Sequence, residues 1–147
     1  MLAILPRPSS QAVRSLRLLV VEDEALVAFE IETFLTGAGH LIVGVAESRG
    51  RALELLRTMS PQPDLALVDI RLAGGDTGLD LAADIGLLGV PVLFVSGNCP
   101  HEQGQGLAVG CLHKPFDEPE LLAAVAAAAA IAAGQAPYYA PAAMHVY

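Results

Sequence analysis

The stretch DLALVDIRL, residues 64–72, decides the fold class of this 147-residue chain. Its apolar run from Leu65 to Val68 is too short for a helix and suits a buried strand. Asp69 ends that run, and the C-terminal end of a strand is where open parallel sheets place their ligands. Asp69 is therefore the first candidate functional residue.

A second strand-like run, RLLVVEDE at residues 17–24, ends in the acid pair Glu22–Asp23. If the two strands are neighbours, their three carboxylates converge at one edge of the sheet. Carboxylates so close together repel one another and raise each other's pKa unless a cation lies among them. The pattern therefore predicts a divalent-metal site with a carboxylate available for chemistry.

Composition limits the class of protein. The length fits one domain, and a hydrophobic fraction of 54% is enough for a core. The net charge of −8 argues against nucleic acid and membrane as primary partners, and it favours a metal or a basic patch on another protein. The opening MLAILPRPSS is too short and too broken by proline for a signal peptide. The apolar run 121–133 falls below the ~18–20 residues that span a bilayer.

The chain contains two cysteines, Cys99 and Cys111, and they do not have CxxC spacing. We therefore expect no disulfide framework and a reducing, cytoplasmic environment. Cys99 is interpreted as a loop residue, and Cys111, in a short apolar strand, as a core residue.

Short apolar segments alternate with helical ones along the chain. Strands are expected at residues 16–22, 41–45, 65–69, 90–95 and 109–113. Helices are expected at 25–36, 48–59, 77–88 and 117–133, with Ser48, Thr77 and Asp117 as N-caps. Glycines make a fifth helical segment, 100–108, weak. This alternation predicts an α/β fold with a parallel sheet covered on both faces.

We expect a flexible lead at residues 1–15, one domain at 16–134 and a tail at 135–147. The tail, rich in Ala, Pro and Tyr, leaves three possibilities open. It docks on the domain, binds a partner, or is disordered.

Polar residues lie at the end of each expected strand except the second, and together they resemble the pattern of a known family. They are Glu22–Asp23, Asp69, Ser96 with Gly97, and Lys114–Pro115–Phe116. With these marks the chain resembles the receiver domain of bacterial two-component response regulators over roughly residues 16–134. The resemblance implies a flavodoxin-like (βα)5 fold, a doubly wound parallel sheet with strand order 2-1-3-4-5.

The resemblance also implies a function, the transfer of a phosphoryl group to Asp69 from a histidine kinase or a phosphotransfer protein. Asp69 would be the nucleophile that forms an aspartyl phosphate. Mg²⁺ would be held by Asp23 and Asp69, by Glu22 mainly through water, and by the backbone carbonyl of Arg71.

Three further residues have roles implied by the family. Lys114 would pair with Asp69 and stabilise a phosphoryl oxygen, aimed inward by a cis Lys114–Pro115 bond. Ser96 would hydrogen-bond the phosphoryl group, and Gly97 would leave room for it. Taken singly, each mark has a plainer interpretation: a helix cap for Glu22–Asp23, a loop hydroxyl for Ser96, and a strand-ending turn for Lys114–Pro115.

The chain departs from the family in three places. Cys111 stands where the family commonly has an aromatic ring, so the usual coupling of that ring to the hydroxyl is in doubt. The segment 97–113 is short, so we expect its helix to be short, irregular or mobile. The loop after Asp69 has Ala73 in place of a common proline, and we hypothesise that the Arg71 side chain reaches over the site and affects phosphate lifetime.

Three functions compete. The first is a receiver that signals through a protein partner or serves as a phosphate relay or sink. The second is a phosphorylation-independent interaction module, a receiver whose switch has decayed. The third is an enzyme, which the sequence disfavours: phosphatases of the haloacid-dehalogenase type place a second aspartate where this chain has Arg71, and flavodoxins need a hydroxyl-rich loop where it has Glu22–Asp23–Glu24. We therefore expect no enzymatic activity beyond self-phosphorylation and autodephosphorylation.

Overall fold

The structure is a computed structural model that describes residues 14–75 and 77–147. Most of the expected lead, residues 1–15, lies outside the described part of the chain.

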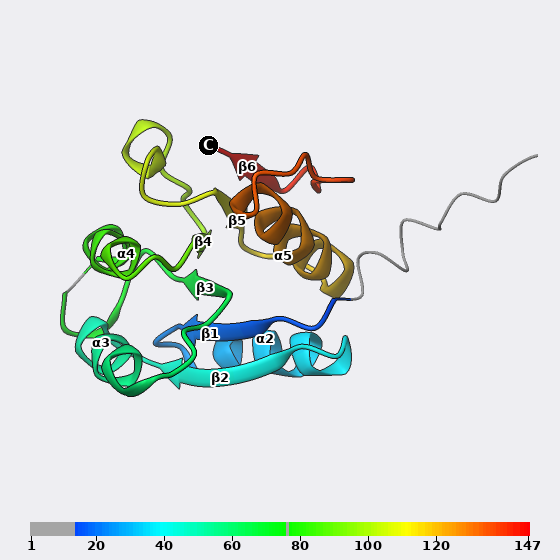
Figure 1. Ribbon diagram of the computed structural model, residues 1–147. Coiled ribbons are helices and arrows are strands. Elements are labelled where there is room, and N and C mark those ends of the chain that lie inside the picture. The colour runs from blue at the N-terminus through cyan, green and yellow to red at the C-terminus, as the bar shows by residue number, and fades with distance from the viewer. Residues whose placement is uncertain (1–13, 76) are drawn as a thin grey trace, which may run out of the picture.

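A six-stranded sheet forms the centre of the molecule, with strand order β2-β1-β3-β4-β5-β6 (Figure 1). The first five strands pair in parallel and the sixth pairs antiparallel to β5. The expected flavodoxin-like order is therefore confirmed, with one strand added at the edge. The strands are β1 (Arg17–Val21), β2 (Leu41–Ala46), β3 (Leu65–Val68), β4 (Val92–Ser96), β5 (Gly110–His113) and β6 (Met144–Val146).

Four α-helices cover the sheet, two on each face (Figure 1). They are α2 (Ala25–Gly37), α3 (Arg49–Thr58), α4 (Gly78–Leu87) and α5 (Glu118–Ala132). One apolar cluster lies between the sheet and α2 and α5, and the second lies between the sheet and α3 and α4. Because β1, β3 and β4 alternate their side chains between these clusters, their residues 18–21, 65–68 and 92–95 are all apolar and buried.

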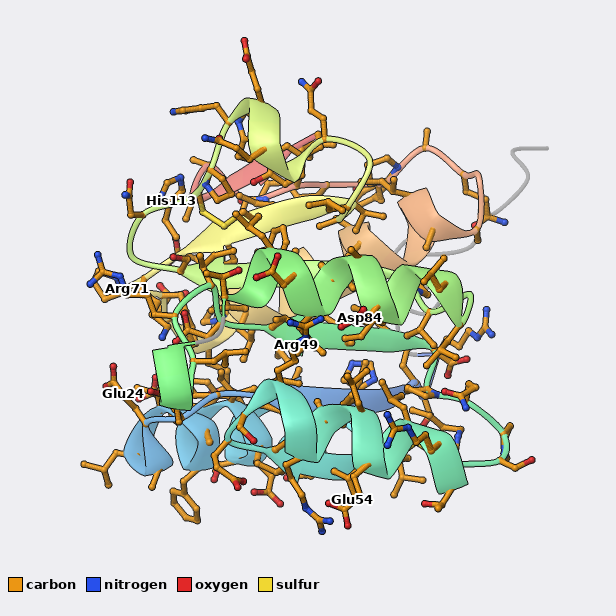
Figure 2. All side chains as sticks on the ribbon, turned by 90° about the vertical axis from the view of Figure 1, so that its left-hand side faces the viewer. Glu24, Arg49, Glu54, Arg71, Asp84 and His113 are labelled. Atoms are coloured by element: carbon orange, nitrogen blue, oxygen red, sulfur yellow. A yellow bond between two sulfur atoms is a disulfide. The ribbon has the colours of Figure 1, made fainter. Side chains whose placement is uncertain are left out.

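The helices begin where the sequence predicts. Ser48 Oγ accepts a hydrogen bond from the Arg51 N–H, and Thr77 Oγ1 accepts one from the Asp80 N–H. Asp117 forms a reciprocal capping box with Glu120, as expected. An ion pair of 2.8 Å between Arg49 and Asp84 also links α3 to α4 (Figure 2).

The segment between β4 and β5 is irregular, as the glycines in it predict. In place of the weak helical segment expected at 100–108 it contains one 3₁₀ turn, Glu102–Gly104. The tail, for which three possibilities were open, docks on the domain through β6. Tyr147 follows β6, and its hydroxyl donates a hydrogen bond to the Pro100 carbonyl.

The expectation that the cysteines form no disulfide is wrong, although Cys99 does lie in a loop and Cys111 in the buried strand β5. Cys99 and Cys111 form a disulfide, with their Cα atoms 5.9 Å apart. The sequence spacing gave no sign of it because the contact depends on the pairing of β4 with β5, which brings the loop after β4 over β5. The cysteine content therefore no longer supports a reducing compartment.

Across residues 14–75 and 77–147, none of the helices combines the length and the apolar character needed to cross a membrane.

Candidate functional site

The site lies at the C-terminal edge of the parallel strands. The register pairs Val21 of β1 with Val68 of β3, so the residues that follow the two strands leave the sheet side by side. The Asp69 N–H extends this pairing by donating to the Val21 carbonyl at 2.9 Å. Figure 2 shows Glu24, Arg71 and His113, which follow or end three different strands, along the same edge of the molecule.

Three carboxylates meet at this edge. Glu22, Asp23 and Asp69 each offer an oxygen, and these oxygens lie within 4.8 Å of one another. Glu22 and Asp69 are buried, with 3% and 7% of their surface exposed, whereas Asp23 is exposed. Hard oxygen ligands with an open, solvent-facing side suit Mg²⁺, which keeps part of its water shell. The residues present therefore fit a magnesium site.

Lys114 neutralises part of this charge. Its Nζ lies 2.6 Å from Glu22 Oε1 and 3.1 Å from Asp69 Oδ2. The sequence predicted the pairing with Asp69 but not the shorter one with Glu22. The Lys114–Pro115 bond is cis, and the Lys114 N–H donates to the Ser96 carbonyl at 2.9 Å, which fixes the start of the side chain beside β4.

The cluster perturbs the ionisation of two of its members. Burial and the neighbouring Asp69 carboxyl raise the pKa of Glu22 to about 7, against the opposing effect of Lys114. Burial alone would lower the pKa of Lys114, but its hydrogen bonds and charge interactions with Glu22 and Asp69 outweigh that and raise it. The ammonium therefore stays charged, and the carboxylates compete for it.

The loop after Asp69 is held close to the acid. Asp69 Oδ1 accepts a hydrogen bond from the Arg71 N–H at 3.2 Å. Gly78, at the start of α4, packs on the same backbone, and a Cβ there would stand 2.2 Å from the Asp69 carbonyl oxygen. Only glycine permits this approach, so the helix start fixes the backbone that carries Asp69.

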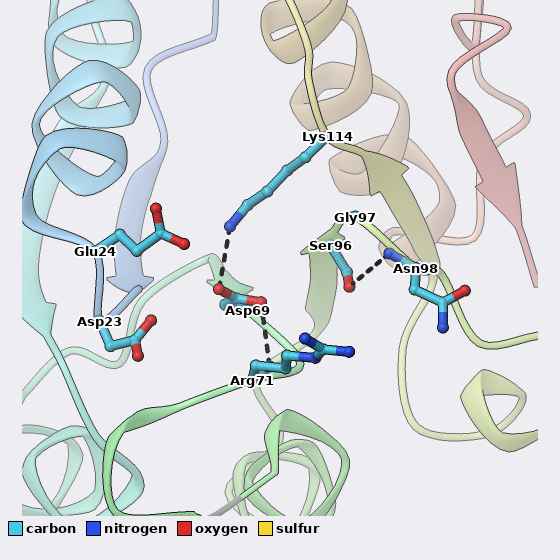
Figure 3. A pocket seen from close by; sticks show the side chains of 8 residues that line it. All are labelled: Asp23, Glu24, Asp69, Arg71, Ser96, Gly97, Asn98 and Lys114. Atoms are coloured by element: carbon cyan, nitrogen blue, oxygen red, sulfur yellow. Dashed lines mark hydrogen bonds and ion pairs between the residues drawn. The ribbon is translucent and has the colours of Figure 1, made fainter.

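An open pocket of about 510 Å³ lies over Asp69 (Figure 3). Asp69 and Lys114 face one another in it, and Ser96 lies on the side of β4. Ser96 Oγ accepts a hydrogen bond from the Asn98 N–H at 3.2 Å. The lining residues are Asp23, Glu24, Asp69, Arg71, Ser96, Gly97, Asn98 and Lys114.

The structure thus brings together all the residues that the sequence singled out. Glu22 is not one of the residues that line the pocket, but it is paired with the lining residue Lys114. Glu24 and Asn98 were missed as lining residues, although each directly extends a motif at the end of a strand, which was the available signal. The Arg71 side chain lines the pocket, and its effect on phosphate lifetime stays a prediction.

Comparison with known families decides the identity of the domain. The family model described as the response regulator receiver domain matches residues 18–126. This chain belongs to the response regulator receiver family. The receiver match covers every residue of the acid cluster together with Ser96 and Lys114.

Two curated proteins and one solved structure are similar to this chain. Phyllosphere-induced regulator PhyR of Methylorubrum extorquens is 40% identical over 80 residues, 54% of this chain and 30% of that protein. Transcriptional regulatory protein PdtaR of Mycobacterium tuberculosis is 30% identical over 125 residues, 82% of this chain and 60% of that protein. The crystal structure of PhyR from Brucella abortus superimposes with a TM-score of 0.73 at 29% identity, covering 86% of this chain and 53% of the other.

This chain spans less than two thirds of these relatives. What it shares with them is the receiver domain of two-component systems. As a receiver it is a regulatory domain rather than a typical enzyme.

Proposed function

We propose that this receiver accepts a phosphoryl group on Asp69 from a histidine kinase or a phosphotransfer protein, in the cytoplasm, and signals through a protein partner. The observation that carries the proposal is the placement of the Asp69 carboxylate, buried below an open pocket and held by the Arg71 N–H and the Lys114 ammonium. An Asp69 oxygen would attack phosphorus, the bond to the donor would break, and the donor would leave with that electron pair.

The other residues of the pocket would serve this transfer. Glu22, Asp23, Asp69 and the Arg71 carbonyl would hold Mg²⁺, which when bound supplies positive charge to the transferring oxygens. Lys114 would exchange its contact with the carboxylates for one with a phosphoryl oxygen. Ser96 would donate its hydroxyl to another oxygen, and Gly97, beside it, leaves the pocket unobstructed. The chain would thereby promote its own phosphorylation and its own dephosphorylation.

The test is incubation of the protein with acetyl phosphate and Mg²⁺, followed by intact mass measurement. The proposal expects one phosphate adduct in the wild type and none in Asp69→Asn. The matched control is Asp64→Asn at the opposite end of β3, where the acid accepts a hydrogen bond from the Arg17 N–H that an amide oxygen also accepts. An adduct that persists in Asp69→Asn would overturn the proposal.

A protein donor needs a surface beside the pocket, and α2 offers one. Leu26 and Phe29 lie in its first turns, close after the pocket residue Glu24, and are 85% and 68% exposed. Such apolar exposure supports docking of a phosphodonor protein there. Phe29→Ser should then slow transfer from a phosphorylated histidine phosphotransfer protein while leaving the reaction with acetyl phosphate unchanged.

A second candidate is the phosphorylation-independent interaction module, and the disulfide favours it, because a crosslinked loop after Ser96 resists rearrangement. A phosphate sink is the variant in which Asp69 reacts but no partner responds. Beryllofluoride, a phosphoryl mimic, separates these functions. Binding with a changed partner affinity supports the signalling receiver, binding without one supports the sink, and no binding supports the interaction module.

A further inference from the structure

The disulfide ties together the two segments that carry the phosphoryl-facing side chains. Cys99 lies three residues after Ser96, and Cys111 lies three residues before Lys114. The crosslink therefore closes the segment 99–111 into a ring whose two ends lead directly into the pocket. Nothing in the receiver function described so far uses this pair.

The Ser96 hydroxyl is tied to its own loop. Its hydroxyl accepts from the Asn98 N–H, so the oxygen and the chain at Asn98 move together. A displacement of the Ser96 side chain toward a group on Asp69 that keeps this hydrogen bond moves Asn98 as well. Cys99, the next residue, is bonded to β5 and resists that shift.

Few other restraints hold the segment between β4 and β5. Between β4 and β5 it contains a single 3₁₀ turn, Glu102–Gly104. Tyr147 packs against Gly104 and donates to the Pro100 carbonyl, which holds the middle of the segment but not its start. The covalent bond is thus the restraint that holds the start of this segment, three residues after Ser96.

We propose that Cys99 and Cys111 form a thiol–disulfide site, reactive toward dithiols and disulfides, whose redox state sets how far the loop 97–109 responds to a phosphoryl group on Asp69. The proposal rests on the function proposed above. With the bond closed, the loop keeps Ser96 in its turn; with the bond open, the loop follows the phosphoryl group.

The redox step balances as thiol–disulfide exchange. Cys99 is 6% exposed and Cys111 is fully buried, so a dithiol attacks the Cys99 sulfur and Cys111 leaves as a thiolate that takes up a proton. The second thiol of the reductant then displaces Cys99. The protein gains two electrons and two protons, and the dithiol becomes a disulfide. Oxidation by a low-molecular-weight disulfide is the reverse reaction and releases two thiols.

The experiment uses the full chain with dithiothreitol as the dithiol, and beryllofluoride with Mg²⁺ as the phosphoryl mimic. Alkylation and intact mass should show no labelled cysteine before reduction and two after it. Beryllofluoride should bind the reduced form about fivefold or more tightly than the oxidised form, in the range of typical coupling between sites. Amide exchange over 97–109 should change on binding in the reduced form and stay unchanged in the oxidised form.

Linkage supplies an independent check, since beryllofluoride must shift the dithiothreitol equilibrium toward the reduced protein by the same factor. The variant Cys99→Ala/Cys111→Ala should bind like the reduced form and ignore dithiothreitol, which controls for other effects of the reductant. Should the variant not fold, the two redox forms of the wild type still decide the matter. Equal affinity and equal exchange in both forms would overturn the redox coupling alone. If beryllofluoride bound neither the oxidised nor the reduced form, that result would instead overturn the phosphoacceptor function, and the coupling with it.

Discussion

Lys114 faces two buried carboxylates, and this competition determines what its removal does. Lys114→Gln keeps a polar side chain but deletes the charge that faces Glu22 and Asp69. Phosphorylation by acetyl phosphate should slow by about 100-fold, the effect of losing one well-placed electrostatic contact to the transferring group. The matched control is Arg51→Gln, an exposed cation that pairs with Glu54 in the same helix, which should leave the rate unchanged. Equal rates in both variants would contradict this role for Lys114.

His40 gives the fold a pH dependence remote from the pocket. Its Nδ1 accepts a hydrogen bond from the Leu16 N–H, which requires an unprotonated nitrogen, and burial lowers the pKa of His40 below its ordinary value. The unfolded chain therefore binds more protons, so this stability is complete above about pH 6.5 and is lost as the pH falls through the folded-state pKa.

The variant His40→Asn isolates that effect, since an amide oxygen accepts the same N–H at every pH. Urea unfolding at about pH 5.5 and pH 7.5, either side of the ordinary histidine pKa, should show a smaller change in unfolding free energy for the variant than for the wild type. Identical changes in the two proteins would show that His40 does not titrate differently on folding.

Helix α4 positions Asp69 through the contact between Gly78 and the Asp69 carbonyl. Gly78→Ala should lower the free energy of unfolding by about 1–3 kcal/mol, the usual cost of overpacking. Gly86→Ala, in the same helix with open space around its Cβ position, should raise it by about 1 kcal/mol through helix propensity. Chemical denaturation of the pair measures both, and a neutral Gly78→Ala would mean that the loop yields easily.

Elements with strong local signals were predictable from sequence, and the exceptions have physical causes. The apolar run before Asp69 and the caps at Ser48 and Asp117 identified their strand and helices because each signal lies within a few residues. The strand β6 has no such signal, since three residues in an Ala- and Pro-rich tail are too few to show a hydrophobic period. They pair with β5 because that strand has no other neighbour on its outer side. Partners far apart in sequence were likewise out of reach, which is why the Cys99–Cys111 bond was missed.

At the scale of the whole molecule, β6 covers the edge of the sheet that β5 would otherwise form. Deleting residues 144–147 exposes the backbone of β5 and removes the Tyr147 ring from Gly104. Unpaired strand edges associate, so sedimentation should detect concentration-dependent self-association in the deletion variant. Tyr138→Ser, which alters a tyrosine that is 85% exposed, should remain like the wild type. A monodisperse deletion variant would show that β6 is not needed to protect this edge.

The architecture places every acid, hydroxyl and ammonium of the pocket at strand ends, so that the sheet itself aligns them around Asp69. The candidate site was therefore largely predictable once the strands were located, whereas the distances that set the charge balance required the folded molecule. Whether Asp69 is the residue that carries the phosphoryl group is the central question about this receiver.

Borohydride answers it directly, because it reduces an acyl phosphate on aspartate to homoserine and leaves free carboxylates intact. The protein is treated with acetyl phosphate and Mg²⁺, reduced, digested and sequenced by mass spectrometry. We expect homoserine at position 69 and at no other acid. Homoserine at Asp23 in place of Asp69, or an unmodified chain, would contradict the assignment of Asp69 as the phosphoacceptor.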